Sequence, residues 1–348
     1  MEFEYNNLKY LVDEQNRLSN SKIIFDKEKP KTLIKFMGNK KYNKEALMNG
    51  YLYLTHASQY NDALDFSRYI FDFSTTDKDD YEKGVANFKS IDERIELPSF
   101  EEAVKDKFNM LHTLNDLLIK SKIGTISLSD GSKLLNSLMW AHYSTDNGFA
   151  IVFETNSFIE NLSHKEGDIN FDFYPMNYVE DLMRFNPLDL NYGALMGGIF
   201  YSVATKENIW IYEDEWRILG INNLNRFFIP KTIENEEYEG MGRFVHYDKN
   251  TICMIVLGEK IFNSQNAIST DEGYKILTDE DKDFINYLYG NFNDKLFLCG
   301  SFSDEKRIIH RAMQKIELIK KNDDIFSINP IGRVIWGNDA KSGAKLLI

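Results

Sequence analysis

The chain has 348 residues, of which 43% are hydrophobic, 27% charged and 14% aromatic. This length allows one large domain or two modest ones, with a sizeable core that needs no disulfide bonds. The formal net charge of −13 opposes nonspecific binding to nucleic acid or to an anionic membrane, and no run of Lys and Arg predicts a strong nucleic-acid patch. No uncharged apolar run reaches the ~18 residues of a membrane-spanning helix, and the acidic start of the chain is unlike a signal peptide. We therefore expect a cytoplasmic protein without a membrane partner.

Hydrophobic spacing predicts the secondary structure in chain order. Apolar residues at positions 8, 11, 12 and 18 have helical spacing, so residues 1–31 are expected to form a helical extension. A helix over residues 44–48 ends at Asn49-Gly50, a common stop signal. Further helices are predicted over residues 99–118, 134–143, 193–204 and 279–289. Strands are predicted over residues 32–37, 51–54, 123–129, 149–153, 171–174, 211–219, 244–247, 252–257 and 325–336.

The order of these elements predicts the fold class. Strands do not alternate regularly with helices, and no Gly-rich strand–helix turn is present. An α+β fold with mostly antiparallel sheets and helical insertions therefore fits better than a doubly wound sheet. Because no internal repeat and no Pro/Gly/Ser-rich linker is found, residues 32–348 are expected to form a single domain. Cys253 and Cys299 lie in apolar stretches without metal-ligand spacing, which predicts buried, reduced thiols.

The most informative segment is residues 211–219, in which aromatic and branched apolar residues alternate with charges. If this segment is a strand, Glu213, Glu215 and Arg217 share one face, while Trp216 lies on the other face in the core. Arg217 can keep one carboxylate ionised while the other faces a substrate. The alternative is a solvated strand face with ion pairs that contribute ~1 kcal/mol or less each.

Two further motifs carry polar or aromatic side chains at short spacing. Ser127 and Ser129 end a predicted strand and point to one face, although composition alone favours a strand end that caps the next turn. Trp140 and Tyr143 share one face of a predicted helix. His142 is a candidate general base or, more simply, a structural histidine, since no Ser or Cys partner is visible.

The polar segment that contains Asn61, Asp62 and Asp65 follows the second predicted strand of the main domain. Asn and Asp side chains build turns by capping backbone groups. Two aspartates three residues apart can also bind a divalent metal. No P-loop, dinucleotide glycine fingerprint, His-Glu-x-x-His or Cys-rich zinc pattern is present.

Taken in order, these motifs resemble a bacterial family known as domain of unknown function 2971. The pieces that carry the resemblance are Leu33-Ile34-Lys35-Phe36, Tyr60 to Asp65, Ser127-x-Ser129, Trp140-x-x-Tyr143 and Trp210 to Arg217. The last piece is the most specific, and the resemblance is strongest over residues 32–260. Ala63 and Leu64 stand where the family has Pro and Phe, so we expect a less rigid loop here.

The order of a basic residue, Ser-x-Ser and Glu-x-Glu is also similar, more distantly, to the Arg–Ser–Glu group of ADP-ribosyltransferases. That resemblance implies two small packed antiparallel sheets around a cleft that binds NAD as a substrate. It implies an ADP-ribosyltransferase or an NAD glycohydrolase with a macromolecular acceptor or protein partner, in the setting of a toxin or a phage-defence effector. It makes Glu215, Glu213 and Ser127 the catalytic residues. The residues it implies for NAD binding are Lys35, Asn61, Ser129, Trp140, Tyr143 and Arg217.

Two other functions compete with this hypothesis. In a non-catalytic binding or regulatory module, the tryptophans are core residues, and the two glutamates and Arg217 form an internal ion network. A metal-dependent hydrolase or nuclease would use the aspartates and glutamates around a divalent ion, but the net charge of −13 counts against a nucleic-acid substrate. The transferase hypothesis requires Lys35, Ser127 and Glu215 to converge on one cleft.

Overall fold

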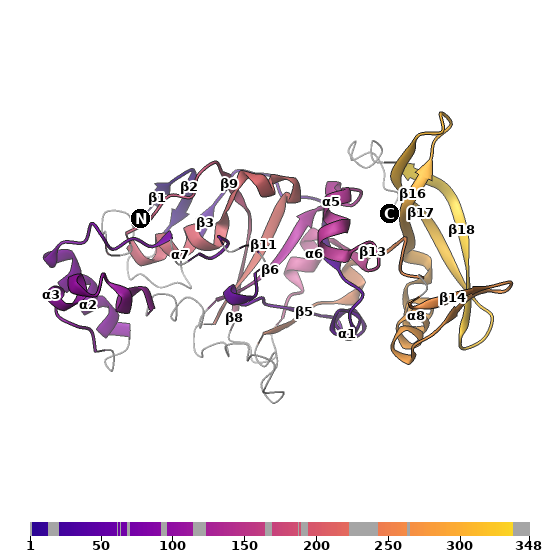
Figure 1. The fold of residues 1–348 in the computed structure, drawn as a ribbon, viewed down its shortest axis with the longest axis horizontal. Helices are drawn as coiled ribbons and strands as arrows, with labels where there is room; N and C mark the ends of the chain where they lie inside the picture. The colour runs from indigo at the N-terminus through magenta and orange to yellow at the C-terminus, as the bar shows by residue number, and fades with distance from the viewer. Residues whose placement is uncertain are drawn as a thin grey trace.

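The computed structural model describes residues 2–12, 21–60, 62, 64–67, 70–91, 96–113, 123–163, 169–186, 188, 194–222, 243–262 and 265–336. Within these residues the fold is α+β with mostly antiparallel sheets, as the sequence predicts (Figure 1). The main sheet has eleven strands, in the spatial order β14 (Ala267–Thr270), β15 (Gly273–Ile276), β18 (Ile325–Trp336), β17 (Ile309–Lys320), β16 (Leu296–Ser303), β13 (Ile252–Gly258), β7 (Phe149–Glu154), β4 (Thr32–Met37), β6 (Ile123–Asp130), β11 (Glu215–Asn222) and β8 (Ile169–Pro175).

Three smaller sheets and several helices surround the main sheet. The smaller sheets are β1 (Glu2–Tyr5), β2 (Leu8–Leu11) and β3 (Lys22–Ile24); β9 (Asn177–Val179) with β10 (Thr205–Glu207); and β5 (Tyr51–Tyr53) with β12 (Phe244–His246). The helices are α1 (Lys41–Asn49), α2 (Lys78–Ile91), α3 (Phe100–Lys105), α5 (Ser137–Met139), α6 (Thr155–Glu160), α7 (Ala194–Ala204) and α8 (Asp279–Phe292). Two small packed sheets around a cleft are therefore not the arrangement that the described strands adopt. In the described residues, no helix is long and apolar enough to cross a membrane.

The central strand β4 has the bounds that its apolar run predicts. Leu33 and Met37 belong to the core on one face of the sheet, and Ile34 and Phe36 to the core on the other. A strand buried on both faces reads as a continuous apolar run, which is why this segment does not alternate strictly with polar residues. Full burial of each such side chain contributes ~1.5–3 kcal/mol to stability.

The end of α1 is also where the sequence places it. Gly50 follows the helix with φ +68°, and its N–H bonds to the carbonyl groups of Ala46 and Leu47. Glycine adopts this left-handed conformation at little cost because it lacks a Cβ atom. The turn leads directly into β5, as predicted.

The N-terminal prediction is wrong. Residues 2–12 and 21–24 contain β1, β2 and β3, which pair in antiparallel order, instead of a helical extension. Leu8 and Tyr10 alternate with exposed residues and pack into a core with the α7 residues Phe200 and Tyr201. A period of two therefore applies here, although the same apolar residues also match a helical spacing. Residues 13–20, including Leu18 of the predicted helix, lie outside the described residues.

Candidate functional site

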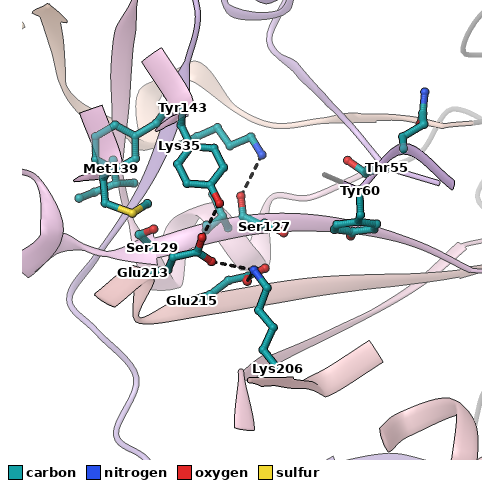
Figure 2. Close-up of a pocket in the computed structure, with 14 residues that line it drawn as sticks. Lys35, Thr55, Tyr60, Ser127, Ser129, Met139, Tyr143, Lys206, Glu213 and Glu215 are labelled. Carbon is teal, nitrogen blue, oxygen red and sulfur yellow. Dashed lines mark hydrogen bonds and ion pairs between the residues drawn. The ribbon is translucent and has the colours of Figure 1, made fainter. Parts of the chain in front are cut away.

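Six of the nine predicted site residues line one pocket of about 300 Å³ (Figure 2). They are Lys35, Ser127, Ser129, Tyr143, Glu213 and Glu215. The remaining walls are formed by Ile34, Phe36, Thr55, Gln59, Tyr60, Leu128, Met139 and Lys206. The convergence of Lys35, Ser127 and Glu215 that the transferase hypothesis requires is therefore present in the fold.

The pocket lies where the main sheet is locally split. β4 pairs with β6 only at Leu33–Asp130 and Ile34–Ser129, while Thr55 bridges β6 at Thr125 further along. Between these two contacts, none of the described strands pairs with this edge of β6 at Ser127. The Lys35 ammonium occupies part of the gap and donates a hydrogen bond of 2.9 Å to the carbonyl oxygen of Ser127.

On its other side, β6 pairs continuously with β11. Glu215 lies opposite Ser129, and Arg217 lies opposite Ser127. Residues directly opposite each other in an antiparallel pair carry their side chains on the same face. The register therefore places both serines and Glu215 beside the same pocket.

The prediction of one strand over residues 211–219 is only half right. Residues Asn208–Glu213 form a 3-10 turn, and β11 begins at Glu215. Asp214 between them has a left-handed backbone with φ +45°. Glu213 and Glu215 thus reach the pocket from two different elements instead of alternating along one strand. The other half of the prediction is confirmed, since Trp216 is fully buried and stacks on Phe173 with ring centroids 4.9 Å apart.

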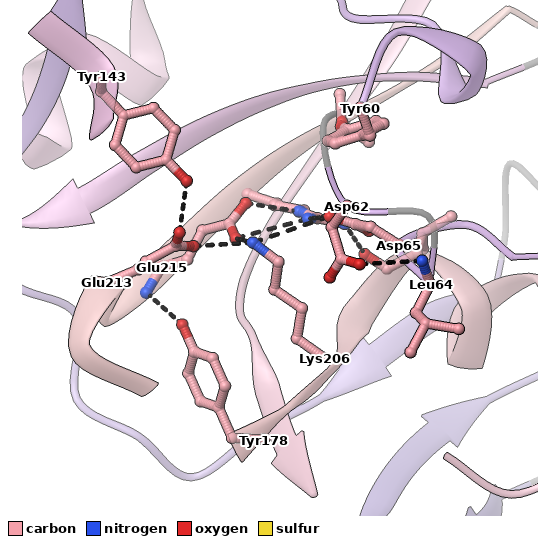
Figure 3. A network of polar contacts seen from close by, with 12 residues as sticks. Tyr60, Asp62, Leu64, Asp65, Tyr143, Tyr178, Lys206, Glu213 and Glu215 are labelled. Atoms are coloured by element: carbon pink, nitrogen blue, oxygen red, sulfur yellow. Dashed lines mark hydrogen bonds and ion pairs between the residues drawn. The ribbon is translucent and has the colours of Figure 1, made fainter. Parts of the chain in front are cut away.

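A buried network of ion pairs joins the pocket residues Lys206, Glu213 and Glu215 to two residues outside the lining, Asp65 and Arg217 (Figure 3). The Lys206 ammonium donates to Glu213 at 2.7 Å and to Glu215 at 3.0 Å, and it lies 3.8 Å from Asp65. Arg217 donates through Nε to Glu215 at 2.6 Å and through its two terminal nitrogens to Asp65. All five residues are between 0% and 6% exposed. Buried charges of this kind need such partners, because their desolvation is costly.

The two pocket glutamates are held in different protonation environments. Burial raises the pKa of Glu213, and the neighbouring Glu215 carboxylate raises it further, against the opposing effect of Lys206. Burial also opposes the charge on Glu215, but Arg217 and Lys206 outweigh it and lower the pKa of Glu215 to about 2. Opposite shifts in a neighbouring carboxyl pair are the pattern expected for an acid–base pair.

Two further pocket side chains are perturbed by their surroundings. Burial lowers the pKa of Lys35 to about 8, although the negative charge of Glu215 acts in the other direction. Tyr143 lies on a short π-helical turn, Trp140–Ser144, and its hydroxyl donates a hydrogen bond to Glu213. Burial, and next the Glu213 carboxylate, raise the pKa of Tyr143, so it remains a neutral donor. Single π-helical turns occur frequently at functional sites.

Three predicted site residues do not line the pocket. Trp140 is fully buried in the core, where its indole nitrogen donates to the Leu134 carbonyl group, so it cannot stack on a ligand. Arg217 is fully buried and contacts the site indirectly, through the hydrogen bond that it donates to Glu215. Asn61 lies outside the described residues. The candidate base His142 is exposed and faces Tyr212, with ring centroids 6.1 Å apart.

Several residues of the site could not be found by reading motifs. Lys206 follows an apolar helix, and nothing in its local sequence distinguishes it from a surface lysine. The sequence makes Asp65 a candidate for a metal ligand or a turn residue, but in the structure it is the ion-pair partner of Arg217. Tyr60 belongs to the same polar segment; its ring stacks on Phe66, and Arg217 lies 5.1 Å from its centroid. In the sequence, only the aromatic residues near Asp65 indicate that its charge is buried.

The metal hypothesis for these carboxylates is not supported by their arrangement. The Lys206 ammonium lies among Glu213, Glu215 and Asp65, where a divalent ion would have to displace it. Asp62 accepts a hydrogen bond from the Leu64 N–H at 2.9 Å and acts as a turn residue. Within the described part of the chain, no group of three or more His, Cys, Asp or Glu side chains has a metal-binding arrangement.

Comparison with known proteins shows that one segment is similar to a family, and it supplies no activity. No curated protein and no solved structure matches the chain. Residues 139–218 match the model of a family described as "Protein of unknown function (DUF2971)". The matched segment contains Tyr143, Lys206, Glu213, Glu215 and Arg217, while Lys35 and Ser127 lie before it. The match thus supports the resemblance of this segment to domain of unknown function 2971.

Proposed function

We propose that the pocket is an active site that cleaves the bond between nicotinamide and ribose in NAD, as an ADP-ribosyltransferase or an NAD glycohydrolase. One observation carries the proposal: two carboxyl groups with opposite pKa shifts, Glu213 and Glu215, line the same pocket as Lys35. Strongly perturbed titratable groups that gather in a cavity are typical of functional sites.

The chemistry needs few protein groups. When the bond from ribose C1′ to the nicotinamide nitrogen breaks, its electron pair stays with nicotinamide, and positive charge develops on the ribose. A fixed carboxylate nearby stabilises that charge. Water or an acceptor hydroxyl then bonds to C1′ and gives its proton to a nearby carboxylate. Glu213 suits this role, because burial raises its pKa and makes it a better proton acceptor than an ordinary carboxylate. Lys35 supplies a positive charge for the phosphates of the substrate.

The size of the pocket sets how NAD would bind. Pockets for small ligands have volumes of roughly 300–1,000 Å³. A pocket of about 300 Å³ is at the lower end, which suits the nicotinamide and its ribose. The adenosine half would then lie outside the pocket.

The test is a nicotinamide-release assay. Purified protein is incubated with NAD, with and without cell lysate as a source of macromolecular acceptors, and free nicotinamide is measured by chromatography. We expect release by the wild type and a loss of ~10²–10⁴-fold in Glu213→Gln, since a general base contributes about that factor. Glu207→Gln is the matched control, because Glu207 lies at the end of β10 outside the pocket lining. Absence of release in both samples, with no thermal shift on addition of NAD, would contradict the proposal.

The biological setting is part of the same proposal. An enzyme that consumes NAD in the cytoplasm would act as a toxin or as an antiviral defence effector. Expression of the wild type should then lower the cellular NAD content, and expression of Glu213→Gln should not. Equal NAD content in both cultures would exclude this role.

A non-catalytic binding or regulatory module remains the second candidate, and the buried network favours it. Lys206 and Arg217 are paired with Asp65, Glu213 and Glu215, so most of the charge in this network is compensated internally. Such a network can hold β10, β11 and the segment around Asp65 together without any chemistry. If the NAD assays are silent and Glu215→Gln mainly lowers the melting temperature, this second candidate is the correct one.

A further inference from the structure

Resting on the proposed function, we infer that Glu213, and not Glu215, is the carboxyl group that contacts the substrate. Glu215 is instead a positioning residue, which acts through Lys206. The resemblance to ADP-ribosyltransferases implies that both glutamates are catalytic, so this assignment departs from it at Glu215.

The hydrogen-bonding capacity of Glu215 is already used. A carboxylate accepts at about four lone-pair positions. Arg217 Nε donates to Glu215 Oε1 at 2.6 Å. Lys206 donates to Glu215 Oε2 at 3.0 Å, and a terminal nitrogen of Arg217 donates to the same oxygen at 3.4 Å. The Ser127 side chain also helps to lower the pKa of Glu215. A ribose hydroxyl could bind Glu215 only by displacing one of these donors.

The hydrogen-bonding capacity of Glu213 is only partly used. Tyr143 donates to one of its oxygens, and Lys206 donates to the other at 2.7 Å. About two of its four acceptor positions therefore remain for a ligand. Glu213 also lines the pocket, so a bound hydroxyl or water can reach these positions.

The backbone holds Glu213 in this position. It ends the 3-10 turn Asn208–Glu213, and the left-handed Asp214 then redirects the chain into β11. The Asp214 carbonyl group accepts a hydrogen bond from the Asp130 N–H. The Asp214 carboxylate forms ion pairs with Lys27 and Lys133. Non-glycine residues in this conformation are uncommon and occur where the structure requires a specific geometry.

Lys206 couples the two carboxylates electrostatically. The charged and titratable groups that face Glu213 are Lys206 from β10, Glu215 from β11, Tyr143 from the π-helical turn, and Tyr178 and Tyr212. Glu215 raises the pKa of Glu213, and Lys206 lowers it. Neutralising Glu215 must therefore lower the pKa of Glu213, whereas removing the charge of Lys206 must raise it further.

The experiment uses these opposite signs. Nicotinamide release from NAD is measured against pH for the wild type, Glu215→Gln and Lys206→Met. Activity falls on the acid side when Glu213 becomes protonated, so the midpoint of that limb reports its pKa. We expect the midpoint to move to lower pH in Glu215→Gln and to higher pH in Lys206→Met. Glu213→Gln should lose ~10²–10⁴-fold in kcat and show no such limb. A general loss of structure would not move the midpoint in opposite directions.

A second measurement separates this inference from the proposed function. In protein labelled with 13C at the glutamate carboxyl carbons, the Glu213 signal should titrate above the usual range and disappear in Glu213→Gln. Glu215 should not titrate above pH 4, and added NAD should shift the Glu213 signal alone. If Glu213 titrates and responds to NAD in this way but the protein releases no nicotinamide, the proposed function is refuted and the inference about Glu213 stands. A shift of Glu215 on addition of NAD, or an acid limb that remains in Glu213→Gln, overturns the inference.

Discussion

Replacement of Arg217 by methionine tests whether the ion network is as buried as its geometry indicates. Arg217 is fully buried and bonds to Glu215, to Asp65 and, at 2.8 Å, to the Val203 carbonyl group. Methionine fills a similar volume but carries no charge and no donor. The change leaves Glu215 with the Lys206 ammonium at 3.0 Å and Asp65 with the same ammonium at 3.8 Å.

Removal of one partner from a buried ion pair typically costs ~3–5 kcal/mol. We expect Arg217→Met to lower the free energy of unfolding by about that amount at pH 7, out of a total of roughly 5–15 kcal/mol for a folded domain. In the wild type, the pKa of Glu215 is about 2, below its ordinary value of 4.5. Its stabilising contribution is therefore present above pH 4.5 and is lost as the pH falls through about 2. The difference between Arg217→Met and the wild type should shrink over that window.

Urea unfolding followed by tryptophan fluorescence measures this difference. The matched control is Arg184→Met, which removes an exposed arginine whose distance to Asp72 is 3.1 Å. Exposed ion pairs contribute ~1 kcal/mol or less, so the control should unfold close to the wild type. If Arg217→Met costs no more than Arg184→Met, or if its deficit does not depend on pH, the description of a buried, charge-dependent network is wrong.

Three further predictions concern single positions. Burial lowers the pKa of Lys35 from its ordinary 10.5 to about 8, so the protonated side chain destabilises the fold, and this cost disappears as the pH rises from about 8 towards 10.5. Lys35→Met should therefore raise the melting temperature at pH 7. An unchanged melting temperature would contradict the lowered pKa of Lys35. Asp214→Ala should be ~1–2 kcal/mol less stable than Asp214→Gly, because the left-handed backbone is strained for alanine and not for glycine, while both variants lose the ion pairs with lysine. Equal free energies of unfolding in urea would refute strain at this position. Cys299 is buried with a pKa raised to about 12, so a thiol reagent at pH 8 should label Cys253 before Cys299, and Cys299 should react only after unfolding.

Much of the main sheet could be predicted from local patterns. The bounds of β4 agree with its apolar run, and β6, β7 and β13 lie where apolar runs predict strands. The alternation of side chains along β6 correctly places Ser127 and Ser129 on one pocket wall. These predictions succeed because helix and strand periodicity and turn preferences act over a few residues.

Where the same local rules failed, two patterns were compatible with one sequence. The apolar residues near position 8 match both a helical and a strand spacing, and only their packing against α7 selects the strand. The segment from Trp210 to Arg217 alternates like one strand, but the left-handed Asp214 interrupts it. Asp tolerates that conformation better than most residues, yet its identity alone does not predict it.

The sequence by itself therefore predicted an α+β chain with Trp216 in its core. The proximity of the two glutamates to the serine-bearing strand was only a requirement of the transferase hypothesis. Only the tertiary structure decided which groups complete the site. Asp65 binds Arg217 across 152 residues of sequence, and Lys206 joins both glutamates from a separate small sheet. The physical reason is that pairing of charges depends on distance in space and on exclusion of water, which arise only when the whole chain has folded.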